Sequence, residues 1–370
     1  MDGWEESGVG KRIACIVGAR PNFIKMAAIL EEMRERRSLE KLLIHTGQHC
    51  SPEMSDRFFE DLRLPAPDVF LGISGGTGTQ QTAAMMQKLE ATFAEERPDL
   101  VLVVGDVNST LAAAMVAAKA GIPVAHVEAG LRSFDRRMPE EINRLMTDAI
   151  ADYLFTSESE AGEQLLKEGV APERIHFAGN VMIDTLLRFR EEASRSPVLE
   201  TLGLKSRGYA VATLHRPSNV DEPARLRELL GMLERLDERL PVVFPVHPRT
   251  RKRMAEAGME TRLKLTEPLG YLDFLRLTSE ARMVLTDSGG IQEETTILQV
   301  PCLTLRENTE RPATVTHGTN RLVGVEPENV LRHAYAVLAG PELEARRPDR
   351  WDGRAAKRIL DVLEAELAGG

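Results

Sequence analysis

The stretch Leu100-Val-Leu-Val-Val-Gly-Asp106 is an unbroken apolar run that ends in a glycine and a carboxylate. Such a run is typical of a strand covered on both faces, which is the habit of parallel strands in α/β proteins. A helical pattern follows it at once. We therefore expect Asp106 at the carboxyl edge of a central strand, where open α/β sheets bind their ligands.

Strand-like runs alternate with helical patterns along the whole chain, which predicts βαβ units and parallel sheets. The polar stretch Ser194-Arg-Ser-Pro197 suits a domain boundary. We expect one doubly wound domain at residues 1–190 and a second at 191–353; the last helix, 354–370, is assigned to the first domain, although sequence alone does not decide this. The expected strands are 12–17, 41–45, 100–104, 123–127 and 153–156, then 209–213, 242–246, 263–266, 283–286 and 302–305. The expected helices are 23–37, 80–96, 110–120, 140–151, 158–168 and 182–193, then 223–239, 250–257, 271–277, 290–299 and 328–338.

The composition is that of an ordinary globular protein, with 370 residues, 42% hydrophobic and 28% charged. The net charge of −10 argues against a general nucleic-acid or membrane-surface binder. Cys15, Cys50 and Cys302 are far apart and form no C-x-x-C pair, so we expect reduced thiols and no zinc site. Because the first residues do not read as a signal peptide and no apolar segment is long enough to span a bilayer, the cytoplasm is expected.

Two further acidic positions accompany Asp106. The strand at 123–127 delivers Glu128 to the same sheet edge, so two acids from neighbouring strands are expected to face one cleft. Glu140 and Glu141 then follow Pro139 at a helix start. For Glu141 and Arg144, helix capping and the helix dipole are a sufficient explanation. Glu140 cannot be assigned from the residues alone.

Two helix starts are candidate anion sites. In the first half, amides at the start of the first helix could bind an anion with Arg20 and Lys25, or these could be surface cations beside a turn. In the second half, the paired glycines of Ser288-Gly-Gly290 would let a diphosphate approach the backbone, and Ser288 can cap or donate. Glu294, one turn further, could accept both hydroxyls of a ribose. A plainly capped helix explains Asp287 and Glu293 as first-turn acids but not the doubled glycine.

Two histidines, His215 and His247, each follow a strand of the second half, and their equivalent positions near an anion site favour ligand contact. The glycine-rich residues 72–79 lack the G-K-[ST] ending of a phosphate-binding P-loop. The first strand is not followed by G-x-G-x-x-G, so sequence support for NAD is missing. We expect neither a cofactor nor a metal.

Taken together, these motifs resemble those of the non-hydrolysing UDP-N-acetylglucosamine 2-epimerases, in the family's order and over nearly the whole chain. The resemblance implies the glycosyltransferase-B architecture, two Rossmann-like doubly wound domains facing across a cleft that holds the nucleotide sugar, and commonly a homodimer. The motifs are Gly18-Ala-Arg-Pro-Asn-Phe-Ile-Lys25, His45-Thr-Gly-Gln-His49, Gly105-Asp-Val-Asn-Ser-Thr110, His126-Val-Glu-Ala-Gly-Leu-Arg132, Met138-Pro-Glu-Glu-Ile-Asn-Arg144, Gly179-Asn-Val181, Leu214-His-Arg216, Asp287-Ser-Gly-Gly-Ile-Gln-Glu-Glu294 and Thr309-Glu-Arg-Pro312.

The resemblance also implies residue roles: carboxylates around the sugar, cations and a histidine serving the diphosphate leaving group, and a pocket for phosphate and ribose. His247 is added from its strand position. The expected catalytic residues are Asp106, Glu128, Glu140 and His215, and the expected substrate-binding residues are Arg20, Lys25, His247, Ser288, Gly289, Gly290, Glu294 and Arg311.

The chain departs from part of the family at two places. Bacterial members that are activated by a second sugar nucleotide have two consecutive arginines after the equivalent of His215, whereas here Arg216 is followed by Pro217. Residues 50–56 also differ. The pattern is similar to the branch that includes UDP-2,3-diacetamido-glucuronate 2-epimerases.

The activity implied is epimerisation at carbon 2 of a UDP-N-acetylhexosamine, by anti elimination of UDP to a 2-acetamidoglucal and its return. Carbon 2 has no adjacent carbonyl, so its proton is weakly acidic and its direct removal and return would be slow. The elimination route needs a base, an acid and stabilisation of positive character at carbon 1, and several carboxylates around one ring suit these roles. A UDP-sugar is the expected partner, and nucleic acid and membrane are not. The alternatives are a 2-epimerase for UDP-2,3-diacetamido-glucuronate, a retaining glycosyltransferase of the same fold, a hydrolysing epimerase and a non-catalytic binder.

Overall fold

The computed structural model describes residues 10–48, 58–340 and 346–369, and the chain divides into two compact units. The first comprises Met1–Thr185 and Asp349–Gly370, and the second comprises Leu186–Pro348. The helix α7 (Val181–Ala193) crosses from one to the other. The expectations about the N-terminal leader, Cys50 and residues 50–56 lie outside the described residues.

The first unit is built on a parallel sheet in the order β3-β2-β1-β4-β5-β6-β7. All five residues of β4 are fully buried at its centre, as the apolar run predicts. The strands are β1 (Lys11–Val17), β2 (Leu39–His45), β3 (Val69–Phe70), β4 (Leu100–Val104), β5 (Val124–Ala129), β6 (Tyr153–Thr156) and β7 (Ile175–Phe177).

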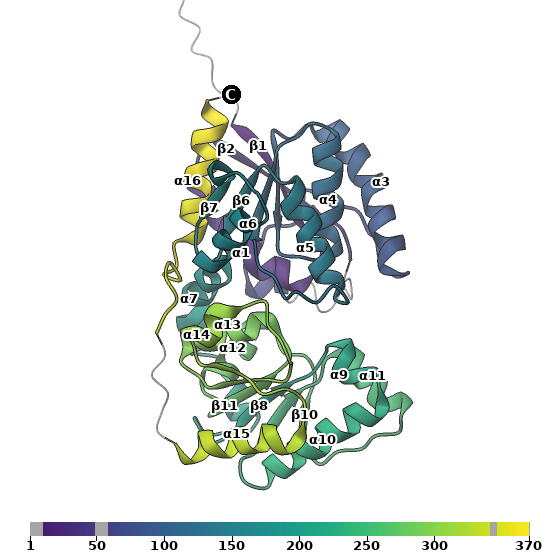
Figure 1. Cartoon of the computed structure of the whole chain (residues 1–370), viewed down its shortest axis with the longest axis vertical. Helices are drawn as coiled ribbons and strands as arrows, with labels where there is room; N and C mark the ends of the chain where they lie inside the picture. Colours follow the sequence, from purple (N-terminus) through teal and green to yellow (C-terminus); the bar gives the residue numbers. More distant parts are fainter. Residues whose placement is uncertain (1–9, 49–57, 341–345, 370) are drawn as a thin grey trace, which may run out of the picture. The chain divides into compact units, whose positions relative to one another are not determined.

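Helices cover both faces of this sheet, with α3, α4 and α5 on one side and α1 and α16 on the other (Figure 1). The C-terminal segment is fastened to this unit, because the Ala356 amide donates to Asp184 at 2.7 Å and the Trp351 indole donates to the Ser157 carbonyl at 2.8 Å. The helices are α1 (Arg20–Arg34), α3 (Gly78–Glu96), α4 (Asn108–Lys119), α5 (Pro139–Ile150), α6 (Ser159–Lys167), the short 3₁₀ helix η1 (Pro172–Arg174) and α16 (Ala355–Ala368).

The second unit repeats the plan with a parallel sheet in the order β10-β9-β8-β11-β12-β13. Helices α10 and α15 pack together over its core, and α12 packs beside α13. The strands are β8 (Ala210–Thr213), β9 (Val242–Pro245), β10 (Lys264–Thr266), β11 (Met283–Thr286), β12 (Cys302–Thr304) and β13 (Asn320–Leu322). The helices are α8 (Val198–Thr201), α9 (Pro217–Val220), α10 (Pro223–Asp237), α11 (Pro248–Glu256), α12 (Tyr271–Ser279), α13 (Gly289–Leu298), α14 (Pro312–Thr316) and α15 (Pro327–Ala339).

The fold class expected from the sequence, two doubly wound parallel sheets, is confirmed. The prediction missed β3, β7 and β13, which have two or three residues each and lie at the ends of their sheets. It also missed the short helices α8, α9 and α14. Segments this short carry no measurable periodicity, so nothing in the sequence separates them from loops.

Each sheet reverses its strand order at one point. In the first unit β1 pairs with both β2 and β4, and in the second β8 pairs with both β9 and β11. The loops that leave such neighbouring strands diverge, and this switch point is where open α/β sheets bind ligands. Asp106 follows β4, while His215 and Asp287 follow β8 and β11.

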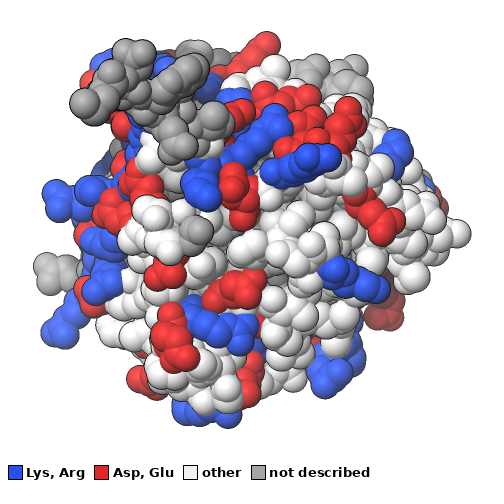
Figure 2. Space-filling model, turned by 90° about the horizontal axis from the view of Figure 1, so that it is seen from above, with Lys and Arg blue, Asp and Glu red and all other residues white. Residues whose placement is uncertain are grey.

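Acidic and basic side chains are interspersed on the face shown in Figure 2, so its charge is not gathered into one patch. None of the helices within residues 10–48, 58–340 and 346–369 has the length and apolarity needed to cross a membrane.

Candidate active site

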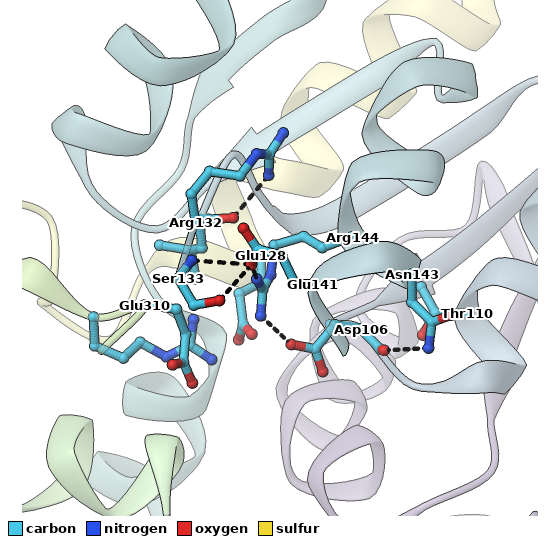
Figure 3. A network of polar contacts seen from close by, with 12 residues as sticks. Asp106, Thr110, Glu128, Arg132, Ser133, Glu141, Asn143, Arg144 and Glu310 are labelled. Carbon is cyan, nitrogen blue, oxygen red and sulfur yellow. Dashed lines mark hydrogen bonds and ion pairs between the residues drawn. The ribbon is translucent and has the colours of Figure 1, made fainter. Parts of the chain in front are cut away.

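Asp106 leaves the central strand of the first unit on a tight turn. Gly105 has a φ of +68°, and a Cβ at this position would lie 3.0 Å from the Lys25 Nζ, so glycine is needed here. The Asp106 side chain is 19% exposed. Arg144 Nη2 donates to its Oδ2 at 2.5 Å, and Asn143 Nδ2 donates to its backbone carbonyl at 2.9 Å (Figure 3). The carboxylate is thus held at the switch point but stays accessible.

Glu128 lies inside β5, one position beyond the predicted end of the strand. The register of β5 shifts between Val127 and Ala129, and Glu128 adopts a φ of +74°. A positive φ is strained for a glutamate, and such bulges re-aim a side chain near functional sites. Its side chain is 3% exposed and pairs with Lys25, Nζ to Oε2, at 2.5 Å.

The two predicted anion-binding cations of the first unit lie in different surroundings. Lys25 is buried in α1 against Glu128. Arg20 is the first residue of α1, and its guanidinium lies 4.3 Å from the centre of the Phe58 ring. Burial lowers the Arg20 pKa to about 10, so this side chain remains a cation at neutral pH.

Glu140 is the second residue of α5 and is exposed. No other described residue forms a hydrogen bond or an ion pair with its side chain. Of the three predicted catalytic carboxylates, two are therefore paired with buried cations, whereas Glu140 has no cation beside it within the described part of the chain.

Glu141 lies in the first turn of α5, as expected, but the helix start does not account for the further contacts of Glu141 and Arg144. Glu141 is buried and accepts hydrogen bonds from the Ser133 amide and hydroxyl, each at 2.9 Å (Figure 3). It also accepts one from the Phe134 amide at 3.0 Å. Arg144, 1% exposed, bridges Glu141 and Asp106. An acid and an arginine three positions apart on a helix do signal a pair. The contact of Arg144 with Asp106, 38 positions away, has no signal in the sequence.

Sequence reasoning also gave no role to the buried His126. Its Nε2 lies 2.8 Å from the Gly105 carbonyl and its Nδ1 lies 2.7 Å from Asp148 Oδ1. Burial alone would raise the Asp148 pKa, but His126 and Arg132 outweigh it and lower that pKa. This network fixes the peptide immediately before Asp106.

In the second unit, Asp287 orients His215. The His215 Nδ1 lies 2.7 Å from Asp287 Oδ1, which leaves Nε2 of the 37% exposed side chain for a ligand. Burial raises the Asp287 pKa, but the imidazole and the amides of His215 and Arg216 lower it to about 2. The His247 ring lies 5.6 Å from the His215 ring, and its Nδ1 accepts from the Arg249 amide at 3.2 Å.

Ser288, Gly289 and Gly290 at the start of α13 are half-buried. Ser288 is its N-cap residue but forms no side-chain cap, so the expected capping role is wrong while its hydroxyl can still donate. A Cβ on Gly289 would lie 2.6 Å from Glu310 Oε1, which explains the glycine by close approach. Gly290 begins the same helical turn. Asp287 precedes the cap, and Glu293 lies beyond the first turn, so neither is a first-turn acid.

Glu294 is buried one turn into α13. Burial and the neighbouring Glu293 raise the Glu294 pKa to about 8, so the carboxyl is largely protonated at neutral pH. Glu293 instead pairs with Arg311, Oε1 to Nε, at 3.1 Å. The predicted ribose acceptor can therefore also donate a hydrogen bond.

Glu310 was not predicted, yet it organises the cations near the α13 start. Arg306 donates to it at 2.7 Å, and an Arg216 nitrogen lies 3.5 Å away. Burial opposes ionisation, but Arg306, Arg311 and Arg216 together hold the Glu310 pKa well below its usual range. Within the described residues no group of histidine, cysteine and acidic side chains is arranged to hold a metal ion.

Two doubly wound units with charged side chains at their switch points define an α/β protein of the glycosyltransferase-B class. The sequence profile described as UDP-N-acetylglucosamine 2-epimerase matches residues 31–364. The chain belongs to this family of epimerases.

Similar proteins agree with this assignment. A UDP-N-acetylglucosamine 2-epimerase of Methanococcus maripaludis is 43% identical, covering 96% of this chain and 99% of its own. The crystal structure of the Methanocaldococcus jannaschii UDP-GlcNAc 2-epimerase in complex with UDP-GlcNAc and UDP has a TM-score of 0.90 at 40% identity, covering 96% and 99% of the two chains. A UDP-2,3-diacetamido-2,3-dideoxy-D-glucuronate 2-epimerase of Pseudomonas aeruginosa is 41% identical over 95% and 99%. The resemblance, fold and epimerase class expected from the sequence are confirmed, while the roles of single residues stay predictions.

Proposed function

We propose that this enzyme interconverts UDP-GlcNAc and UDP-ManNAc by epimerisation at carbon 2. The observation that carries the proposal is that Asp106 follows β4 at the switch point of the first unit with the Glu128 carboxylate beside the same turn, in a chain of the 2-epimerase family. Asp106 and Glu128 are each paired with a buried cation, and Glu140 is exposed without one among the described residues. Carboxylates in such different surroundings suit the separate proton-transfer and charge-stabilising tasks of one reaction.

The reaction is an elimination followed by an addition. A base removes the proton from carbon 2, a double bond forms between carbons 1 and 2, and the electrons of the carbon–oxygen bond leave with UDP. UDP then returns to carbon 1 while carbon 2 is protonated on its other face. Asp106, Glu128 and Glu140 are the residues that we assign to the proton transfers and to the positive character at carbon 1.

The second unit supplies groups suited to UDP. Backbone amides at the α13 start and the Ser288 hydroxyl, which makes no cap hydrogen bond, would bind the diphosphate. His215, oriented by Asp287, would donate to the leaving phosphate oxygen, and Arg311 adds positive charge. Glu294 would contact the ribose. Fixed donors aimed at an oxygen on which charge develops act as electrostatic catalysts. Arg20 in the first unit is assigned to the same diphosphate.

The test is incubation of UDP-GlcNAc in deuterated water. Deuterium at carbon 2 of both UDP-GlcNAc and UDP-ManNAc is expected, with little free UDP. Retention of hydrogen without UDP-ManNAc would exclude the proposal. Stoichiometric UDP that requires a sugar acceptor would indicate a glycosyltransferase, and free ManNAc would indicate a hydrolysing epimerase.

A second candidate substrate is UDP-2,3-diacetamido-glucuronate, because the Pseudomonas aeruginosa relative named for it is 41% identical over 95% of this chain. Product analysis by NMR over a panel of UDP-sugars separates the two. The proposed substrate should be turned over with the higher kcat/KM, and a preference for the diacetamido uronate would replace it.

We also place the enzyme in the cytoplasm as a homodimer. The described cysteines, Cys15 and Cys302, are buried free thiols, which suits a reducing compartment. The family resemblance supports the dimer. Light scattering coupled to size-exclusion chromatography measures the mass, and a single 41.0 kDa species would contradict the dimer.

A further inference from the structure

We propose that Arg144 is the positioning residue of Asp106: it holds Oδ2 of the carboxylate and leaves Oδ1 for the sugar. The inference rests on the epimerase function proposed above, and it adds a residue that the sequence explained only as part of a helix. Three observations support it: two contacts from α5 to Asp106, the burial of the guanidinium, and the anchoring of that guanidinium by Glu141.

Two consecutive residues of α5 hold Asp106 at two different atoms. Asn143 Nδ2 donates to the Asp106 carbonyl at 2.9 Å and to Asn108 Oδ1 at 3.1 Å. Arg144 Nη2 donates to Asp106 Oδ2 at 2.5 Å (Figure 3). Within the described residues, Asp106 Oδ1 accepts no hydrogen bond. The two carboxylate oxygens are thus inequivalent in the described part of the chain, where Oδ2 is held by Arg144.

The guanidinium is itself fixed. Arg144 is 1% exposed, and its Nη1 pairs with Glu141, whose side chain is 2% exposed. Glu141 in turn accepts three hydrogen bonds from Ser133 and Phe134. Arg144 is therefore anchored on a buried acid that is tied to the loop before α5, and it cannot follow a rotation of Asp106 without breaking this pair. We call Arg144 and Glu141 the Asp106 clasp.

The clasp matters because proton transfer tolerates little misplacement. Catalytic groups must lie within about 0.5 Å of the productive geometry, and an error of about 1 Å can cost roughly 10²-fold in rate. Removal of the clasp leaves the Asp106 backbone held by Asn143 but takes away the guanidinium that holds Oδ2, so the carboxylate can rotate. The expected defect is in turnover rather than in binding of the UDP moiety, for which the second unit provides the groups.

The test compares Arg144→Met and Arg144→Lys with the control Arg34→Met, which removes an arginine whose side chain is 72% exposed on α1. Arg144→Met should lower kcat about 10²-fold with KM changed less than about threefold. Arg144→Lys keeps the charge but cannot bridge both acids, so it should recover part of kcat. The control should match the unchanged enzyme. A kcat in Arg144→Met equal to that of the control, or a loss confined to KM, would overturn the proposal.

A double-variant comparison separates positioning from general structural damage. If Arg144 acts through Asp106, adding Arg144→Met to Asp106→Asn should lower the residual rate no further. A double variant whose fold-loss of rate equals the product of the two single-variant losses would contradict the clasp. Should Arg144→Met fail to fold, the Arg144→Lys and Asp106→Asn pair carries the same comparison.

A measurement that does not depend on turnover tests the clasp independently of the proposed function. If no UDP-hexosamine acquires deuterium with the unchanged enzyme, the function proposal fails. Carboxyl ¹³C NMR of labelled aspartate, with the Asp106 signal assigned by Asp106→Asn, still tests the contact. Arg144→Lys should shift that signal, and an unmoved signal would refute the contact.

Discussion

The buried pair of Lys25 and Glu128 gives the sharpest stability prediction. Its atoms lie 2.5 Å apart, and the two side chains are 4% and 3% exposed. Lys25→Met removes the cation that lies against the buried Glu128 carboxylate of the first unit. Breaking a buried pair from one side costs about 3–5 kcal/mol, because the remaining charge keeps its desolvation penalty.

This free energy predicts a measurable change in melting temperature. The first unit has roughly 200 residues. For a unit of that size, 1 kcal/mol shifts Tm by about 2–4 °C, so Lys25→Met should lower the Tm of this unit by about 6–20 °C in differential scanning calorimetry. The matched control is Lys11→Met, whose Nζ lies 3.5 Å from Asp99 with side chains 43% and 37% exposed. An exposed pair contributes at most about 1 kcal/mol.

A double variant tests whether the charge that remains at Glu128 causes the loss of stability. Lys25→Met combined with Glu128→Gln removes both charges and should recover most of the lost stability, while turnover stays low because the predicted catalytic carboxylate is gone. Equal Tm losses for Lys25→Met and Lys11→Met would refute the reasoning. Failure of the double variant to recover stability would show that packing, rather than charge, decides the loss.

Three further predictions concern the second unit. Since the pKa of Glu294 is raised from 4.5 to about 8, the folded protein binds more protons than the unfolded chain between these values, and the contribution of this group to stability falls as pH rises through that window. In urea titrations, the free energy of unfolding of Glu294→Gln minus that of the unchanged protein should therefore increase between roughly pH 5 and pH 8, the window set by these pKa values. A difference that does not change with pH would contradict the assignment. His215→Asn should lower kcat by about 10²-fold or more. Asp287→Asn should show a related loss, because Asp287 holds the His215 imidazole at 2.7 Å. An unchanged kcat in His215→Asn would exclude the leaving-group role. Gly289→Ala should weaken UDP binding in calorimetry, because the added Cβ would lie 2.6 Å from Glu310 Oε1. The matched control is Gly231→Ala in α10, where an added Cβ would have nothing within 4 Å, and this variant should bind UDP normally. Equal affinities would show that the α13 start does not hold the diphosphate.

The sequence by itself determined the longer helices and strands and the class of fold. The central run at 100–104 is covered on both faces, and each polar residue that follows a buried strand of a parallel sheet is carried to the same sheet edge. These are local properties, because periodicity, caps and strand ends involve residues that are close together in the chain. The same locality made Asp106 and Glu128 recognisable as candidate site residues, since each lies within a few residues of a strand end.

Contacts between distant segments were decided only by the tertiary structure. Arg144 and Glu141 fit an ordinary helix start when only α5 is considered, and their connection to Asp106 and Ser133 appears once the helix packs beside the β4 turn. Lys25, expected to bind the diphosphate, lies against Glu128, and the register shift of β5 beside that glutamate is not indicated by any local sequence pattern. Whether a buried side chain stays ionised, and how strongly it interacts, depends on which opposite charge lies within a few ångströms. That neighbour is set by how strands and helices assemble, whereas the sequence sets only which charges are available.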